Sequence, residues 1–115
     1  MRRILIVDDE PLIAMMMEDW LSELGFEPIG PVGSVASALQ ATTEHSIDGA
    51  ILDVSLGAGG DGYEVARILR QRNIPFAFAT GGEAEDMDSQ FRNVAVLTKP
   101  FDFESVKAVL QSLFP

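Results

Sequence analysis

Five polar side chains that could do chemistry stand at or just after the ends of short apolar runs in the sequence. They are Asp8, Asp9, Asp53, Thr80 and Lys99. Short apolar runs bounded by turn residues are typical of buried strands, and open α/β sheets bind their ligands at the carboxyl ends of the strands. If these strands are parallel, three carboxylates, one hydroxyl and one ammonium group meet at one edge of the sheet.

The carboxylates indicate a metal site. Asp8, Asp9 and Asp53 would repel one another at neighbouring strand ends, so clustering them costs stability unless a cation binds. Oxygen ligands without His or Cys favour a hard ion, Mg²⁺ first. The alternative is that Asp8, Asp9 and Glu10 form only an acidic cluster at a helix N-terminus, where the helix dipole favours negative charge. Asp53 makes that alternative the weaker one.

Lys99 and Thr80 favour phosphoryl chemistry over a plain metal site. A metal site has no use for an ammonium group, whereas a phosphoryl group has oxygens that need both a cation and hydrogen-bond donors. The alternatives are that Lys99 is an exposed charge at a strand end and that Thr80 is an ordinary strand residue. Beside the carboxylates, the two residues predict a site for a phosphoryl group.

The periodicity of apolar residues predicts strands and helices in alternation. Strands are expected at residues 3–7, 26–32, 50–53, 75–79 and 94–97, and helices at about 11–24, 34–43, 61–72, 83–92 and 102–113. Asp9 or Glu10, Ser34 and Asp102 are the expected helix caps. Such alternation predicts an α/β fold, a doubly wound parallel sheet with helices on both faces. Pro28 and Pro31 mark the second strand as an edge strand.

Length and composition limit the possible functions. A chain of 115 residues predicts a single domain, residues 1–115. The net charge of −10 argues against direct binding of nucleic acid or of an anionic membrane. The absence of Cys, of a signal peptide and of a membrane-length apolar segment favours a cytoplasmic protein. Met1 just before the first strand favours a natural start, with a domain cut from a longer chain as the alternative.

Three other motifs favour structural interpretations. Gly57, Gly59 and Gly62 match the dinucleotide-binding fingerprint, but no basic residue lies nearby and the chain is short for that fold, so a flexible loop is favoured. The run 15–17 of three methionines could form an adaptable binding surface, but core filling on an amphipathic helix is favoured. His45 lies in a polar connection and is expected to be solvated.

The pattern of Asp8-Asp9, Asp53, Thr80 and Lys99-Pro100 resembles the receiver domain of two-component response regulators, over residues 4–113. The resemblance implies a flavodoxin-like sheet of five parallel strands in the order 2-1-3-4-5. It also implies that Asp53 is the phosphoacceptor and that the Lys99-Pro100 peptide is cis. Asp9, Asp53 and the Ser55 backbone carbonyl would then bind Mg²⁺ directly, and Asp8 through water.

The sequence departs from the receiver pattern in three places. Many receivers have Tyr or Phe three residues before the lysine, where this chain has Val96. The connection from Asp53 to Gly62 is about one residue longer than usual, with Leu56-Gly57 in place of a common Met-Pro. Residues 78–82 are similar to the single-domain "FAT GUY" subgroup, although the subgroup's following tyrosine is glutamate here.

The resemblance implies a phosphoacceptor switch that catalyses its own phosphorylation and dephosphorylation. The donor would be a sensor histidine kinase or a phosphotransfer protein, and an unknown downstream protein would read the signal. Thr80 would draw the loop Gly81-Gly82-Glu83 inward toward the phosphoryl group, and this loop and the helix expected at residues 83–92 would change for partner binding. One alternative is an aspartate-nucleophile phosphatase of the haloacid-dehalogenase type, which would need an acid where Ser55 stands. The other alternative is a pseudo-receiver that only binds partners.

Overall fold

A five-stranded parallel sheet forms the centre of the computed structural model, which describes residues 1–81, 91 and 93–115. The strands are β1 (Arg3–Val7), β2 (Glu27–Val32), β3 (Gly49–Asp53), β4 (Phe76–Thr80) and β5 (Ala95–Thr98). Their order is β2-β1-β3-β4-β5, and every neighbouring pair is parallel. The predicted α/β fold and its strand order are therefore confirmed.

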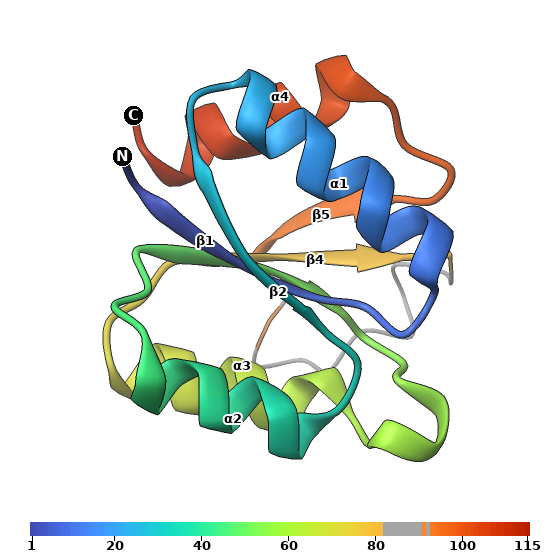
Figure 1. Cartoon of the computed structure of the whole chain (residues 1–115), viewed down its shortest axis with the longest axis vertical. Helices are drawn as coiled ribbons and strands as arrows, with labels where there is room; N and C mark the ends of the chain where they lie inside the picture. Colours follow the sequence, from blue (N-terminus) through green and yellow to red (C-terminus); the bar gives the residue numbers. More distant parts are fainter. Residues whose placement is uncertain (82–90, 92) are drawn as a thin grey trace.

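Helices cover both faces of the sheet (Figure 1). They are α1 (Pro11–Glu23), α2 (Val35–Glu44), α3 (Gly62–Gln71) and α4 (Phe103–Leu113), with a short 3-10 turn, η1 (Gly57–Gly59). Helices α1 and α4 lie on one face, and α2 and α3 on the other. The helix predicted at residues 83–92 lies largely outside the described residues. In the described part, no helix is long and hydrophobic enough to span a bilayer.

Two hydrophobic cores follow from the alternation of side chains along the central strands. Ile4, Ile6 and Ile51 pack with α1 and α4, whereas Leu5 and Leu52 belong to the core on the side of α2 and α3. Successive side chains of a strand point to opposite faces, so a sheet covered on both faces needs strands that are apolar throughout. The uninterrupted apolar runs of β1 and β3 meet that requirement.

Side-chain caps fix where three of the helices begin. Ser34 and Asp102 are helix caps, as predicted, and each forms a reciprocal capping box with a serine three residues later. Asp61 accepts a hydrogen bond from the Tyr63 N–H at the start of α3. Helix α1 differs, because Glu10 occupies the cap position without a side-chain capping bond. The carboxylate of Glu10 is bound to Lys99 instead.

The three consecutive methionines of α1 have different environments. Met17 is 2% exposed and packs in the core beside Leu21. Met15 and Met16 are 59% and 39% exposed. The interpretation of the run as core filler is therefore right for Met17 and wrong for Met15 and Met16. The buried stripe of a helix recurs every three or four residues, so three successive residues cannot all lie in it.

Helix α3 begins in close contact with the end of β3. The Gly62 N–H donates to the Val54 carbonyl oxygen at 2.9 Å. A Cβ on Gly62 would overlap the carbonyl oxygen of Asp53 and lie 3.1 Å from the Val54 Cα. Both neighbours are backbone atoms, which cannot rotate away as the end of a side chain can. The residue at position 62 must therefore be glycine for α3 to start here.

We expect Gly62→Ala to lower the free energy of unfolding by about 1–3 kcal/mol, the usual cost of overpacking. The matched control is Gly81→Ala, because a Cβ there would come no closer than 3.9 Å to the Lys99 Cβ. Urea unfolding monitored by circular dichroism measures both variants. Equal midpoints for the two variants would contradict the close contact at Gly62.

Candidate functional site

The carboxyl ends of the central strands bring most of the predicted residues to one edge of the sheet. An open cavity of about 450 Å³ lies there. Its lining comprises Asp9, Glu10, Asp53, Val54, Ser55, Gly57, Thr80, Gly81 and Lys99. Asp8 is buried beside this cavity, with its Oδ2 3.4 Å from the Lys99 Nζ. Gly82, which was also predicted to act here, lies outside the described residues.

The Lys99 ammonium group lies among three carboxylates. Its Nζ is 2.9 Å from Glu10 Oε1, 3.1 Å from Asp53 Oδ2 and 3.4 Å from Asp8 Oδ2. Burial alone would lower the pKa of Lys99, but the bonds to Glu10 and Asp53 and the nearby negative charges hold it well above its usual range. The amine therefore carries a full positive charge at neutral pH.

Asp53 is a buried carboxylate with both oxygens engaged. Its Oδ1 accepts a hydrogen bond from the Ser55 N–H at 3.2 Å, and its Oδ2 accepts one from the Lys99 Nζ at 3.1 Å. Burial raises the pKa of Asp53, and the charge of Asp8 adds to that effect, while Lys99 and Ser55 oppose it. The net shift is upward, so in this fold the ionised carboxylate is less favoured than in water.

The acidic residues at this edge could hold a metal ion. Asp8, Asp9, Glu10 and Asp53 each offer a carboxylate oxygen, and these oxygens all lie within 4.8 Å of one another. Asp8 is fixed by its Oδ1, which accepts the Glu10 N–H at 2.8 Å, whereas Asp9 is exposed. Oxygen donors alone, with an excess of negative charge, suit a hard divalent cation such as Mg²⁺.

Backbone pairing between β4 and β5 fixes Thr80 next to Lys99. The Lys99 N–H donates to the Thr80 carbonyl oxygen at 2.8 Å, and Thr80 pairs with Thr98 in the sheet register. The Lys99–Pro100 peptide bond directly after this contact is cis. The strand pairing thus brings a hydroxyl and an ammonium group from distant parts of the sequence to neighbouring positions.

The glycine-rich connection after Asp53 packs closely against its surroundings, where the sequence favoured a flexible loop. Gly57 has a φ of +58°, and a Cβ there would lie 3.3 Å from Asp9 Oδ2. A Cβ on Gly59 would overlap the Gly33 carbonyl oxygen and meet Ser34 Cα at 3.0 Å. The spacing that resembles a dinucleotide fingerprint is explained by these contacts with the β2–α2 connection and with the acidic edge.

Val96 lies outside the cavity. It pairs with Phe78 across β4 and β5, is half-buried, and packs against the hydrophobic core on the α2 and α3 side. Glu10, by contrast, belongs to the site although the sequence suggested only a charge at a helix terminus. Its 2.9 Å contact with Lys99 spans 89 positions of sequence. The available signal was a third acid directly after the predicted pair.

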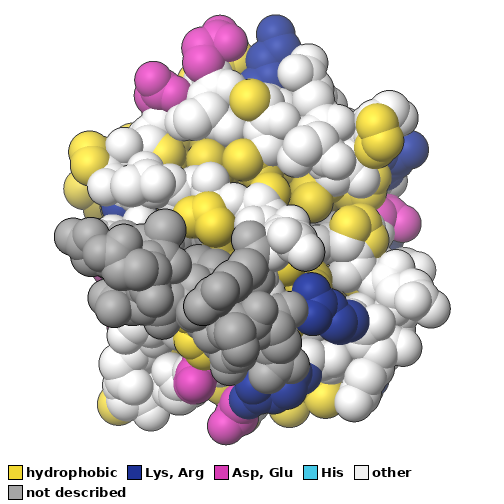
Figure 2. Space-filling view, turned by 180° about the vertical axis from the view of Figure 1, so that it is seen from behind, with side chains coloured by type: hydrophobic (Ala, Val, Ile, Leu, Met, Phe, Trp, Pro, Cys, Tyr) yellow, Lys and Arg dark blue, Asp and Glu magenta, His cyan; other side chains and the backbone are white. Residues whose placement is uncertain are grey.

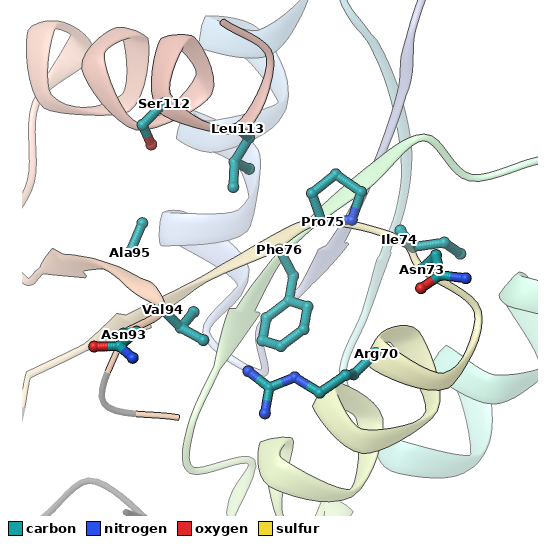
Figure 3. Close-up of a pocket in the computed structure, with 10 residues that line it drawn as sticks. All are labelled: Arg70, Asn73, Ile74, Pro75, Phe76, Asn93, Val94, Ala95, Ser112 and Leu113. Carbon is teal, nitrogen blue, oxygen red and sulfur yellow. The ribbon is translucent and has the colours of Figure 1, made fainter. Parts of the chain in front are cut away.

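A second cavity, of about 600 Å³, lies near the amino-terminal ends of β4 and β5 (Figure 3). Arg70 and Phe76 line it, and the Arg70 guanidinium is 4.6 Å from the centre of the Phe91 ring. Figure 2 shows the face opposite to that in Figure 1, where hydrophobic side chains form a band that runs from side to side in the upper half of the view. The cavity of about 600 Å³ has no carboxylate in its lining, so its larger volume does not make it the candidate site.

Comparisons with known proteins agree with this geometry. The family model described as the response regulator receiver domain matches residues 4–111. The solution structure of SdrG from Sphingomonas melonis is 49% identical with a TM-score of 0.88, covering 100% of this chain and 98% of that one. The crystal structure of TrrA from Thermotoga maritima in complex with Mg²⁺ and BeF is 28% identical with a TM-score of 0.86, covering 99% and 100%.

A curated relative with a longer chain is the transcriptional regulatory protein MalR of Bacillus subtilis. It is 32% identical over 96% of this chain and 49% of its own length. The chain spans about half the length of several curated relatives that it matches. The family match covers most of the chain and the site residues lie inside it. The chain therefore belongs to the response regulator receiver domains, the phosphorylatable switches of two-component signalling.

Proposed function

We propose that Asp53 is the phosphoacceptor, and that its donor is a phosphohistidine on a sensor histidine kinase or a phosphotransfer protein. The observation that carries this proposal is the contact of 3.1 Å between Asp53 Oδ2 and the Lys99 Nζ at the cavity. A buried carboxylate beside a fixed ammonium group can act as a nucleophile while the charge on the incoming phosphoryl group is neutralised. We extend the proposal to residues 1–115 as one receiver domain.

The transfer exchanges one bond to phosphorus for another. A carboxylate oxygen of Asp53 attacks the phosphorus atom, and a P–O bond forms as the P–N bond to the histidine breaks. The electron pair of the broken bond stays on the imidazole nitrogen, which takes up a proton. Lys99 moves its hydrogen bonds toward the phosphoryl oxygens, since its other partner Glu10 is half-exposed and can turn into solvent.

Asp9, Asp53 and the Ser55 carbonyl would hold Mg²⁺ directly, with Asp8 bound through water. The clustered carboxylate oxygens support this assignment for the three aspartates. When bound, the ion supplies positive charge that offsets charge developing on the phosphoryl oxygens. Asp8 is buried and already accepts a hydrogen bond from the Glu10 N–H, which is consistent with binding the ion through water. Asp9 is exposed and can turn toward an ion.

Thr80 would report the phosphoryl group to the rest of the molecule. Its hydroxyl would donate to a phosphoryl oxygen and draw the Gly81-Gly82 loop inward. Val96 has a β-branched side chain with one χ angle and already packs against the core, so it cannot swing as an aromatic ring would. The backbone after Thr80 would therefore carry the change. Membership of the FAT GUY subgroup remains a prediction.

The first test is phosphorylation of the chain and of Asp53→Asn by acetyl phosphate with Mg²⁺. We expect the parent chain to take up roughly one acid-stable, base-labile phosphoryl group and the variant none, because an amide cannot replace the carboxylate nucleophile. Intact mass spectrometry measures both. Undiminished labelling of the variant would place the acceptor elsewhere. Many turnovers would indicate a phosphatase, and no labelling of the parent chain a pseudo-receiver.

The same variant has a built-in control for folding. Because the pKa of Asp53 is raised in the fold, its ionised form destabilises the native state above the ordinary Asp pKa. Without Mg²⁺ at neutral pH, Asp53→Asn should be at least as stable as the parent chain. That advantage should shrink as the pH falls through the raised pKa and vanish below the ordinary one. Urea unfolding at several pH values measures it.

Mg²⁺ should raise the thermal midpoint, because it binds the native acidic cluster and not the unfolded chain. At about a hundredfold excess over its Kd, a ligand stabilises the native state by about 2.7 kcal/mol. Asp9→Ala should lose most of this gain and Asp8→Ala less. Asp19→Ala is the matched control, an exposed acid of α1 that lies outside the cluster. Equal gains for the parent chain and Asp9→Ala would refute the proposed ligand.

Hydrogen exchange tests the path of the switch. On addition of beryllium fluoride and Mg²⁺, we expect the largest change in amide protection between Gly81 and Arg92. Thr80→Ala should suppress that change, whereas Val96→Ala should leave it intact because Val96 does not contact the cavity. If Val96→Ala abolished the response as fully as Thr80→Ala, β5 would belong to the relay and the proposed path would be wrong.

A further inference from the structure

The outer side of α1 carries an exposed hydrophobic patch, formed by Leu12, Met15 and Met16 and called here the α1 patch. Leu12 is 70% exposed, Met15 59% and Met16 39%. Residues three and four positions apart share one side of a helix, so these side chains are neighbours. Single exposed apolar residues are normal on a protein surface, whereas adjacent ones indicate a contact surface.

Acidic residues border the α1 patch at both ends. Glu10 precedes it and is half-exposed, and Asp19 and Glu23 continue the same side of the helix toward its C-terminus, both exposed. Helix α1 contains no Lys or Arg. The patch therefore fits a helix with apolar residues flanked by basic ones, because complementary charges guide the encounter and set the register.

The occupant that we assign to this surface is the protein phosphodonor, so the inference rests on the proposed function. Helix α1 starts directly after Glu10, which lines the cavity and contacts Lys99. A donor whose histidine reaches Asp53 must cover the rim of this cavity. The first two turns of α1 follow directly from Glu10, and they carry the α1 patch.

We propose that Met15 and Met16 are a redox modification site, and that their oxidation to sulfoxides by hydrogen peroxide blocks docking of the phosphodonor. A lone pair of the thioether sulfur attacks one oxygen of the peroxide. An S–O bond forms, the O–O bond breaks, and the second oxygen leaves as water after proton transfer. The sulfur is oxidised and the peroxide is reduced. Each flexible apolar side chain becomes a polar one.

The chain contains the controls for this proposal. Cys is absent from the sequence, so no thiol competes for the oxidant. Met17 adjoins the pair in sequence but is only 2% exposed. Met1 is 87% exposed but precedes β1, and thus lies at the amino-terminal edge of the sheet, away from the acidic edge. The effect of oxidation at Met15 and Met16 can therefore be distinguished from oxidation at Met1 and Met17.

Peptide mapping by mass spectrometry after graded peroxide treatment of the folded chain is the first measurement. We expect Met15 and Met16 to form sulfoxide at least about tenfold faster than Met17, because reaction follows exposure. In urea the three rates should become similar. Equal rates for Met17 and its neighbours in the folded chain would overturn the assignment of the site.

Phosphotransfer is the second measurement. The probe is a radiolabelled histidine phosphotransfer protein, selected because it labels the untreated chain. Oxidation should slow this transfer by about tenfold or more, since a sulfoxide buried in an apolar contact loses its hydrogen bonds to water. Labelling by acetyl phosphate should stay within about twofold, because so small a donor needs no docking surface. If acetyl phosphate fails to label the untreated chain, the proposed function fails, whatever the oxidation result.

The deciding variant is Met15→Leu with Met16→Leu, which keeps the surface apolar and removes both thioethers. Its transfer rate from the protein donor, measured against its own untreated sample, should not change on peroxide treatment, although its other methionines still oxidise. Met17→Leu, the matched control, should stay peroxide-sensitive. Transfer to the oxidised parent chain at the untreated rate would overturn the proposal, and so would a peroxide-sensitive double variant.

Discussion

The ammonium group of Lys99 is the interaction on which the acidic edge depends. Three carboxylates converge on it, at 2.9, 3.1 and 3.4 Å. Without a cation, Asp8 and Asp53 would repel each other in a nearly buried position, and burying unpaired charge is costly. Removing one partner of such a cluster leaves the others uncompensated. The amine therefore stabilises a site whose own members work against the fold, and it stands where the proposed phosphoryl group needs positive charge.

The position of Lys99 at the acidic edge follows from the pairing of parallel strands in the sheet. Apolar strands, buried on both faces, end at the same edge because they are parallel, and β5 joins the sheet next to β4 in a register that sets Lys99 beside Thr80. The polar residues of the proposed site add little to the hydrophobic core. Their position follows from the residues that precede them in each strand, so the site is a consequence of where apolar runs stop.

Strong local signals explain what the sequence predicted well. Short continuous apolar runs predicted the sheet, and Pro28 with Pro31 predicted its edge strand. Ser34 and Asp102 predicted two helix caps. Side-chain partners across the fold were beyond reach, since nothing local links Glu10 to Lys99. The same limit applies to Met15 and Met16. The spacing of apolar residues indicates that the helix has a buried stripe, but a run of three methionines does not show which of them lies in that stripe.

The close contact at Gly62 has a mechanical consequence. With no room for a Cβ between Gly62 and the Asp53 carbonyl oxygen, the last residue of β3 and the first turn of α3 pack backbone against backbone. A displacement of Asp53 toward α3 would meet backbone atoms, which cannot move aside by rotation of a side chain. On phosphorylation of the proposed acceptor Asp53, the conformational change would then spread in the other direction, through the strand end that holds Thr80. Helix α3 would then keep its position relative to Asp53 while the backbone after Thr80 moves.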